Sequence, residues 1–248
     1  MVRGGTGKVL SVAGGAAVHT STAVSSYSVR MFQKGSASSR PLLGLAAGVV
    51  VLALLSLGFS FDQAAVDWAQ MRRSYALDFV ATLITNLGSP LVVLLLAFAG
   101  SGVLLALRRG RLAAFLLLNV LLVSGLNEGV KQLVQRPVVQ VSPSSKPAPP
   151  QPTVLRHPVI IATPKLPRTV YAFPSGHSAG SAAVLLALAF FGRARRWRGW
   201  LWAGCGVLAV LVGLSRVYLG AHTPSDVLGG WALAWACFCT LRVWWRPA

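Results

Sequence analysis

The chain has 248 residues, of which 54% are hydrophobic and 11% are charged. A soluble domain of this length carries about a quarter charged residues, so the composition excludes an ordinary soluble enzyme and favours one compact, all-α membrane domain. The net charge of +18 lies mostly beside apolar runs, as at Arg108, Arg109 and Arg111. That arrangement is typical of membrane boundaries, so we expect no nucleic-acid partner.

The first forty residues differ from the rest of the chain. Residues 1–40 are rich in Gly, Ser and Ala and contain five basic residues but no acidic one. They predict a disordered cytoplasmic tail, or an extension upstream of a start at Met31.

Six apolar segments then follow, each close to the about 17–25 residues that a helix needs to cross a bilayer. They cover residues 41–59, 90–107, 112–133, 176–192, 199–215 and 225–241. In the second, Ser89 is expected to cap the helix and Pro90 to occupy its first position. The pattern predicts a six-helix bundle over residues 41–242, followed by a cytoplasmic tail at 243–248.

The distribution of charges predicts how this bundle is oriented in the membrane. Residues 1–40, the turns at 108–111 and 193–198, and residues 242–248 carry fourteen of the 23 Lys and Arg residues and none of the five acids. This basic side should face the cytoplasm, with both termini. The opposite side contains a Pro-rich loop at 138–173 and a segment, 61–80, that is expected to form a short helix on that surface.

Three polar clusters fall on this second side. Pro174-Ser175-Gly176-His177 lies at the start of the fourth apolar segment. A helix start offers free N–H groups and a positive dipole to an anion, and His177 adds a titratable proton. The alternative is an ordinary capped helix with an interfacial histidine.

The next cluster runs from Ser215 to Asp226. Arg216 ends the fifth segment, His222 lies in the short loop, and Asp226 falls in the first turn of the sixth. A carboxylate four residues after a histidine can accept its ring N–H and leave the other nitrogen free to attack. Asp226 also suits a helix start for its effect on the dipole.

The remaining cluster contains Lys131 and Arg136 at the outer end of the third segment. Both side chains are suited to snorkelling toward the interface. Glu128 stands one helical turn before Lys131 and can pair with it. Ionisable residues so close to a membrane are nevertheless functional candidates.

Together the clusters resemble the type-2 phosphatidic acid phosphatase superfamily of membrane lipid phosphatases. Its signatures are a Lys, six residues and Arg-Pro; a PSGH; and Ser-Arg, five residues, His, three residues and Asp. The second matches at Pro174–His177 and the third at Ser215-Arg216, His222 and Asp226. The resemblance covers about residues 41–242.

The first signature departs from the family pattern. Counted from Lys131, the family arginine should stand at Val138; counted back from Arg136-Pro137, the lysine should stand at Gly129. Arg136 is a candidate substitute, because residues two apart on an extended segment point to the same side. Arg168 is another.

The resemblance implies a mechanism through a phosphohistidine. His222 is expected to attack phosphorus, Asp226 to orient its ring, and His177 to protonate the leaving oxygen. The expected phosphate ligands are Lys131, Arg136, Ser175, Gly176 and Arg216. No metal or other cofactor is expected.

A site at the membrane boundary favours a lipid phosphate as substrate. Candidates are undecaprenyl pyrophosphate, phosphatidic acid and phosphatidylglycerol phosphate, and membrane lipids are the expected surroundings. The Arg-, Ala- and Leu-rich composition is typical of a GC-rich bacterium, which predicts the inner (plasma) membrane with the site facing outward.

Other functions remain open on sequence alone. A phosphotransferase of the same superfamily would pass the phosphoryl group to a lipid or sugar instead of water. A non-catalytic lipid carrier would keep the fold without the reaction. Vanadate haloperoxidases share these motifs, but on soluble scaffolds that six spans disfavour. The oligomeric state is not predicted.

Overall fold

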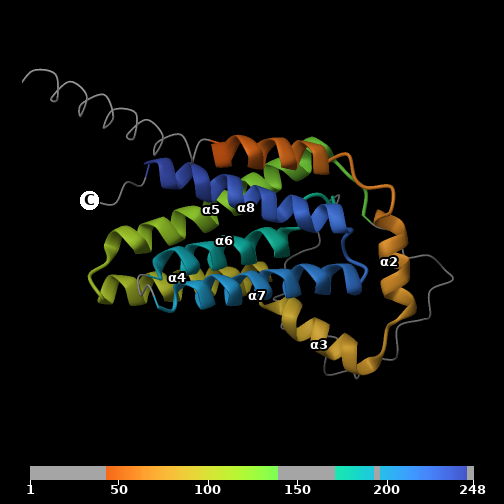
Figure 1. Cartoon of the computed structure of the whole chain (residues 1–248), viewed down its shortest axis with the longest axis horizontal. Coiled ribbons are helices and arrows are strands. Elements are labelled where there is room, and N and C mark those ends of the chain that lie inside the picture. Colours follow the sequence, from red (N-terminus) through yellow and green to blue (C-terminus); the bar gives the residue numbers. More distant parts are fainter. Residues whose placement is uncertain (1–42, 139–170, 193–195, 245–248) are drawn as a thin grey trace, which may run out of the picture. The chain divides into compact units, whose positions relative to one another are not determined.

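The computed structural model describes residues 43–138, 171–192 and 196–244, and within these ranges every regular element is a helix. A first helix, Leu43–Leu55, precedes seven labelled ones (Figure 1). These are α2 (Asp62–Met71), α3 (Tyr75–Asn86), α4 (Pro90–Ala106), α5 (Gly110–Val134), α6 (Gly176–Phe191), α7 (Arg198–Tyr218) and α8 (Pro224–Trp244). The all-α prediction is confirmed for the described residues.

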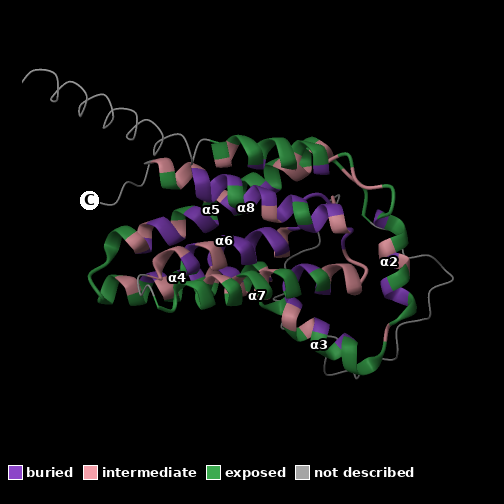
Figure 2. Ribbon diagram, viewed as in Figure 1, coloured by how far each residue is buried: buried purple, intermediate pink, exposed green. Residues whose placement is uncertain are grey.

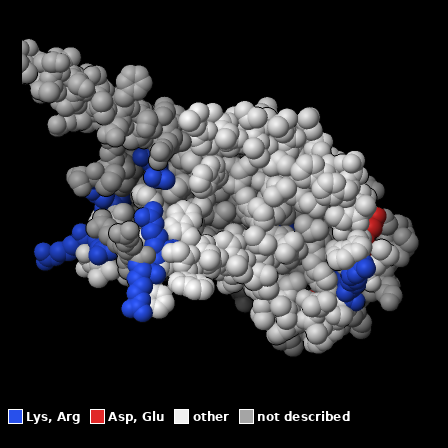
Figure 3. All heavy atoms as spheres, viewed as in Figure 1, with Lys and Arg blue, Asp and Glu red and all other residues white. Residues whose placement is uncertain are grey.

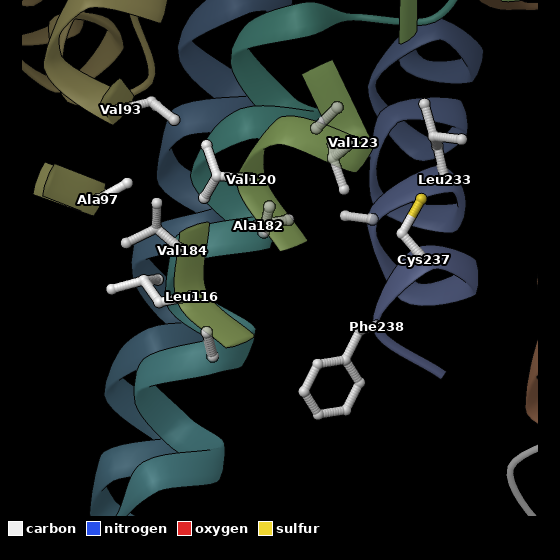
Figure 4. Close-up of a cluster of buried hydrophobic side chains, with 14 of the residues drawn as sticks. Val93, Ala97, Leu116, Val120, Val123, Ala182, Val184, Leu233, Cys237 and Phe238 are labelled. Atoms are coloured by element: carbon white, nitrogen blue, oxygen red, sulfur yellow. The ribbon is translucent and has the colours of Figure 1, made fainter. Parts of the chain in front are cut away.

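Helix α6 is the central element of the bundle, in contact with α4, α5, α7 and α8. Its inner surface is built from small residues, including Ala179, Gly180 and Ala183. Small side chains let membrane helices approach closely. A Cβ on Gly180, for example, would lie 3.3 Å from a methyl group of Val93 in α4. The largest core cluster surrounds this helix, with Leu116, Val120 and Phe238 among its members (Figure 4).

The outer helices are apolar on their exposed faces as well. Helix α4 buries Val93, Ala97 and Ser101, while Leu91, Leu95 and Phe98 are exposed (Figure 2). In water such a surface would be unstable, but lipid chains match it. The predicted cap of this helix is confirmed: the Ser89 hydroxyl accepts the Val92 N–H, and Pro90 takes the first position.

The segment 61–80, predicted as one short helix, instead forms α2 and the first part of α3. Ser74 starts the second helix, and its hydroxyl accepts the Leu77 N–H. Helix α3 packs along α7. The Tyr218 hydroxyl at the end of α7 donates to Asp78 at 3.0 Å, and Arg73 pairs with the same carboxylate at 2.8 Å. This polar junction holds α3 against the end of α7.

Three of the described helices are long and apolar enough to cross a membrane: α5, α7 and α8. Helices α3 and α4, bent by 46° at their junction, pass the same test of length and composition only as a pair, which fits a broken span or a re-entrant loop. Leu43–Leu55 and α6 are apolar but shorter. Membrane-spanning helices are therefore present, and the count of six spans stays a prediction.

Basic residues gather at one end of these helices. Arg108, Arg109 and Arg111 are exposed at the α4–α5 turn, and Arg196 and Arg198 are exposed at the start of α7. Figure 3 shows the blue side chains concentrated there. Because α5 and α7 begin at this end, Lys131 and Arg216 lie at the other end. The tail at 1–40, most of the loop at 138–173, Arg168 and residues 245–248 lie outside the described residues.

Candidate active site

The position of His222 is set by the end of α7. Gly220 adopts a left-handed conformation with φ of 69°, which glycine tolerates best at a helix end. The N–H groups of Ala221 and His222 both donate to the Arg216 carbonyl, at 3.0 and 3.3 Å. The chain therefore reverses tightly, and the buried His222 is held next to Arg216.

The start of α8 fixes Asp226 by a reciprocal cap. The Thr223 N–H donates to Asp226 Oδ2 at 3.0 Å, and the Asp226 N–H donates to the Thr223 hydroxyl at 3.3 Å. This is the capping-box arrangement, with Asp in place of Glu. Asp226 Oδ2 also lies 3.6 Å from His222 Nδ1, slightly beyond a hydrogen bond. No other described group bonds that nitrogen.

The segment before α6 is joined directly to α8. The Ser175 N–H donates to the Asp226 carbonyl at 2.9 Å. Gly230 permits this approach, because a Cβ there would lie 2.6 Å from the Ser175 carbonyl oxygen. Ser175 is fully buried, and its hydroxyl caps α6 by accepting the Ser178 N–H and hydroxyl. Two motifs about fifty residues apart are thus brought together.

His177 lies in the first turn of α6, where it is partly buried. Arg216, His222 and Lys131 are all close enough to act on it electrostatically. Gly88 packs against its backbone, since a Cβ on Gly88 would lie 2.8 Å from the His177 carbonyl oxygen. The two histidines and two cations therefore meet at the start of α6.

The last turns of α5 face the same helix start. A Cβ on Gly176 would lie 4.0 Å from Lys131 Nζ and 3.4 Å from Asn127 Nδ2. Lys131 is partly exposed, whereas Asn127 is buried. The N–H groups of Gly176 and His177, which have no partner inside the helix, form none of the hydrogen bonds found among the described residues.

Arg216 reaches this site from α7 and is supported by α3. Its Nη1 donates to the hydroxyl of the buried Thr85 at 3.2 Å. Its Nε is buried and bonds no other described group. The guanidinium is thus held on one edge only.

Arg136 has a different environment from the other cations. Its Nη1 donates to Asp226 Oδ1 and to the Ser225 hydroxyl, both at 2.7 Å. Its Nη2 donates to the carbonyls of Leu55 and Ser56, at 2.8 and 2.6 Å. The guanidinium also lies over the Phe173 ring, 4.6 Å from its centroid. It therefore joins the first helix to the start of α8.

Asp62 completes this second network from α2. It is buried, accepts the Ser225 hydroxyl, and also accepts the Ser225 N–H at 3.1 Å. Its other bond, at 2.9 Å, comes from the Phe59 N–H. Asp62, Ser225, Asp226 and Arg136 form one continuous chain of bonded polar groups.

Burial sets the protonation of His222. It lowers the pKa of the imidazole below its ordinary value, and the charges of Arg216 and Lys131 act in the same direction. Asp226 opposes them and raises this pKa. The net direction is downward, so the ring is neutral at neutral pH and able to act as a nucleophile.

Comparison with known proteins identifies the family. The model of the PAP2 superfamily matches residues 112–248, which is more than half of the chain. The chain belongs to the PAP2 superfamily. Its resemblance to the type-2 phosphatidic acid phosphatases is thereby confirmed.

Individual relatives match shorter segments. Phosphatidylglycerophosphatase B of Bacillus subtilis is 38% identical over 84 residues, which cover 32% of this chain and 41% of that protein. Undecaprenyl-diphosphatase of Sulfolobus acidocaldarius is 36% identical over 92 residues, covering 35% of this chain and 39% of that protein. The matches thus span about two fifths of these relatives.

The fold is also that of a solved PAP2 protein. The crystal structure of the transmembrane PAP2-type phosphatidylglycerolphosphate phosphatase from Bacillus subtilis superposes with a TM-score of 0.61 at 24% identity. The match covers 82% of this chain and 94% of that one. With its membrane-spanning helices, this chain is an integral membrane protein with the PAP2 fold.

The structure places the site residues predicted from sequence in two groups. Lys131, Gly176, His177, Arg216 and His222 surround the start of α6, with Asp226 behind His222. Ser175 is buried under the same helix start, and Arg136 bonds protein acceptors instead of facing the others.

Sequence reasoning missed three neighbours of the site. Asn127 had a usable signal, because it stands four residues before Lys131 and so lies on the same helix face. Thr85 and Asp62 had none, since each acts on a residue more than a hundred positions away.

Proposed function

We propose that this PAP2 protein is a membrane phosphatase that hydrolyses lipid phosphates or pyrophosphates through a phosphohistidine at His222. One observation carries the proposal. His177, His222, Lys131 and Arg216, from separate parts of the chain, are grouped around a helix start whose first N–H groups have no partner among the described residues. Two imidazoles and two cations are what transfer of a phosphoryl group to histidine requires.

In the first step His222 Nε2 attacks phosphorus, because Nδ1 faces Asp226. A P–N bond forms while the bond to the leaving oxygen breaks. His177 becomes protonated when the anionic phosphoryl group binds beside it and offsets the charges of Arg216 and Lys131, and it then gives the leaving oxygen that proton. Asp226 stabilises the positive charge that develops on the His222 ring. The short gap of 3.6 Å between Nδ1 and the carboxylate closes when that ring becomes cationic.

In the second step water breaks the P–N bond. His177, now neutral, takes a proton from the attacking water, and inorganic phosphate leaves. Lys131, Arg216 and the N–H groups of Gly176 and His177 hold the phosphoryl oxygens in both steps. This donor set supplies positive charge without a metal ion, so we expect chelators to leave activity unchanged.

Arg136 is proposed to position another residue and not to bind phosphate. It was predicted as a phosphate ligand, but its Nη1 and Nη2 are bonded to Asp226, Ser225 and two carbonyls. We propose that it positions Asp226, and through it His222. Phosphate binding then depends on Lys131 and Arg216.

The substrate is proposed to be an amphiphile. An apolar cavity of about 560 Å³ lies between α2, α7 and α8, and its lining includes Tyr218 and Pro224 at the ends nearest Arg216 and His222. A second, of about 580 Å³, shares Leu228 and Trp231 with it and extends between α6, α7 and the first helix. Acyl or prenyl chains suit both.

The named relatives indicate which amphiphiles to test. They are a phosphatidylglycerophosphatase and an undecaprenyl-diphosphatase, so phosphatidylglycerol phosphate and undecaprenyl pyrophosphate are the first candidates. Phosphatidic acid is added because the motifs resemble those of the type-2 phosphatidic acid phosphatases. We propose that the site faces outward from a bacterial plasma membrane, opposite the basic end.

A lipid panel tests the proposal. Phosphate release is measured on full-length protein in detergent for the three lipids and for nitrophenyl phosphate, beside His222→Ala and His177→Ala. We expect release from at least one lipid, a loss of about 10⁴-fold or more in the His222 variant, and a smaller loss, about 10²–10⁴-fold, in the other. Undiminished release by His222→Ala, or equal rates on nitrophenyl phosphate, would contradict it.

A further inference from the structure

Asn127 is the most deeply buried polar side chain facing the start of α6 from α5. It is 5% exposed, and its Oδ1 has no hydrogen-bond partner among the described residues. A buried, unpaired amide oxygen is costly in a membrane helix, where no water compensates for it. An unpaired group of this kind is expected where a ligand supplies the missing partner.

The direction of this side chain points to the ligand. Asn127 Nδ2 lies 3.4 Å from the point that a Cβ on Gly176 would occupy, and Lys131 Nζ lies 4.0 Å from the same point. The amide and the ammonium therefore border the same space at the helix start. Gly176 leaves that space open because it has no side chain.

The need for another donor follows from the first motif. Counted from Lys131, the position of the signature arginine holds Val138, which is 44% exposed. The neighbouring Arg136 is bonded to Asp226 and Ser225. Among the described residues, this motif therefore brings Lys131 to the site as a cation without a bonded protein partner, in place of a lysine and an arginine.

We infer that Asn127 is a further substrate-binding residue, whose side-chain amide bonds the phosphoryl group beside Lys131. The amide N–H donates to a phosphoryl oxygen, and Oδ1 accepts from the hydroxyl of a monoprotonated phosphoryl group. This inference deepens the proposed function and rests on it.

A second buried asparagine on the same helix provides the matched control. Asn119 is fully buried, and its Nδ2 donates to the Ala183 carbonyl in α6 at 2.8 Å, while its Oδ1, like that of Asn127, has no partner among the described residues. The two asparagines therefore differ in Nδ2, which bonds α6 in Asn119 and borders the space beside Gly176 in Asn127. The bond from Asn119 is the ordinary use of an amide between membrane helices. Asn119 lies two turns away from Asn127 toward the basic end, so its replacement should change stability without changing phosphate affinity.

The test compares Asn127→Ala with Asn127→Asp in full-length protein. Aspartate keeps the shape of asparagine but places a negative charge beside the phosphoryl group. We expect the inhibition constant of inorganic phosphate, and the KM for phosphatidic acid, to rise about 10-fold in the Ala variant. In the Asp variant both should rise about 100-fold. The corresponding Asn119 variants should leave both constants within about 2-fold of the wild type.

If Asn127 had only a structural role, the Ala variant would show the larger rise in the inhibition constant and in KM, and the Asp variant the smaller one. The reason is that aspartate has the shape of asparagine and disturbs packing less than alanine does. Wild-type constants in Asn127→Asp, or an Ala variant that binds phosphate more weakly than the Asp variant, would overturn the inference.

Calorimetric binding of inorganic phosphate separates this result from the proposed function. If the wild-type protein binds phosphate but releases none from any lipid, the proposed function fails, and weaker binding by Asn127→Asp still supports this residue. If the wild-type protein is active, and Asn127→Ala and Asn127→Asp both bind phosphate as tightly as the wild type does, only the role of Asn127 fails. Absence of both activity and binding in the wild type overturns both.

Discussion

The two sides of the site differ in how completely their polar groups are bonded. The bonded side consists of Asp62, Arg136, Thr223, Ser225 and Asp226, which hold one another through short hydrogen bonds. The open side consists of Asn127, Lys131, Gly176, His177 and Arg216, where an amide oxygen, a guanidinium nitrogen and two backbone N–H groups have no described partner. His222 lies between the two sides.

This difference indicates the role of each residue. A buried charge that is fully paired is expensive to disrupt, because removing one partner leaves the other unpaired. A buried donor without a partner weakens the fold and is retained for another reason. We therefore expect substitutions on the bonded side to reduce stability and substitutions on the open side to reduce activity, with Asp226, which contacts His222, affecting both. The same contrast distinguishes two arginines of this site, Arg136 on the bonded side and Arg216 on the open side.

The largest effect on activity short of the histidines is expected at Arg216. Arg216→Ala removes a cation whose one side-chain bond within the described part of the chain is to Thr85, so kcat/KM should fall about 10³-fold. The thermal unfolding temperature in detergent should stay the same or rise, because an incompletely paired buried charge is removed.

Arg198→Ala is the control, since Arg198 is exposed at the other end of the same helix. It should leave activity and stability unchanged. A collapse in stability without a specific loss of turnover in Arg216→Ala would place Arg216 on the bonded side.

Arg136→Gln should have its main effect on stability. The change leaves the buried carboxylate of Asp226 without its cation, at a cost of about 3–5 kcal/mol in the free energy of unfolding. Denaturant titration in mixed micelles measures it. Arg109→Gln, at an exposed position in the turn between α4 and α5, should cost less than about 0.5 kcal/mol. Full stability combined with a weaker affinity for phosphate would return Arg136 to the phosphate ligands predicted from sequence.

The pH profile reports the state of His222, which joins the two sides. Because burial lowers its pKa, the acid limb of kcat/KM should lie below the about 6.5 of an ordinary histidine. Asp226 raises this pKa, so Asp226→Asn should lower it further. The acid limb of the residual activity should move down by about 1 pH unit. A limb that moves to higher pH would mean that His222 is not the group observed.

The smallest effect is expected at Thr85. Thr85→Val removes the hydroxyl that accepts Arg216 Nη1 while keeping the side-chain shape. One net hydrogen bond corresponds to about a 5-fold loss, which should appear mainly in KM. Thr85→Ser should restore the activity. Equal losses in the Val and Ser variants would indicate packing instead of positioning.

Much of the fold could be predicted because membrane helices depend on local patterns. The apolar run and the Ser89-Pro90 start placed α4 to within one residue, and α6 likewise begins at the predicted Gly176. The residues 61–80 gave a weaker pattern. Their break at Ser74, and the packing of α3 on α7, depend on Asp78 meeting Tyr218 far along the chain.

The site was predictable where the motif itself contains the geometry. His222 and Asp226 are four residues apart around a helix start, so their proximity follows from sequence. Arg136 illustrates the limit. Its position beside the site was foreseen, but its partners Leu55 and Ser56 come from the first helix, which no local pattern connects to it. Partners that are distant in sequence determine whether a cation is bonded to protein groups or remains available to bind phosphate.

The most direct test of the account is to trap the covalent intermediate. Full-length protein is mixed with a phosphate-labelled lipid substrate, quenched in alkali, in which phosphohistidine survives, and digested for mass spectrometry. We predict label on the peptide that contains His222, and none in His222→Ala. Label on another residue, or turnover in which the wild-type protein never becomes labelled, would contradict the claim that His222 is the nucleophile.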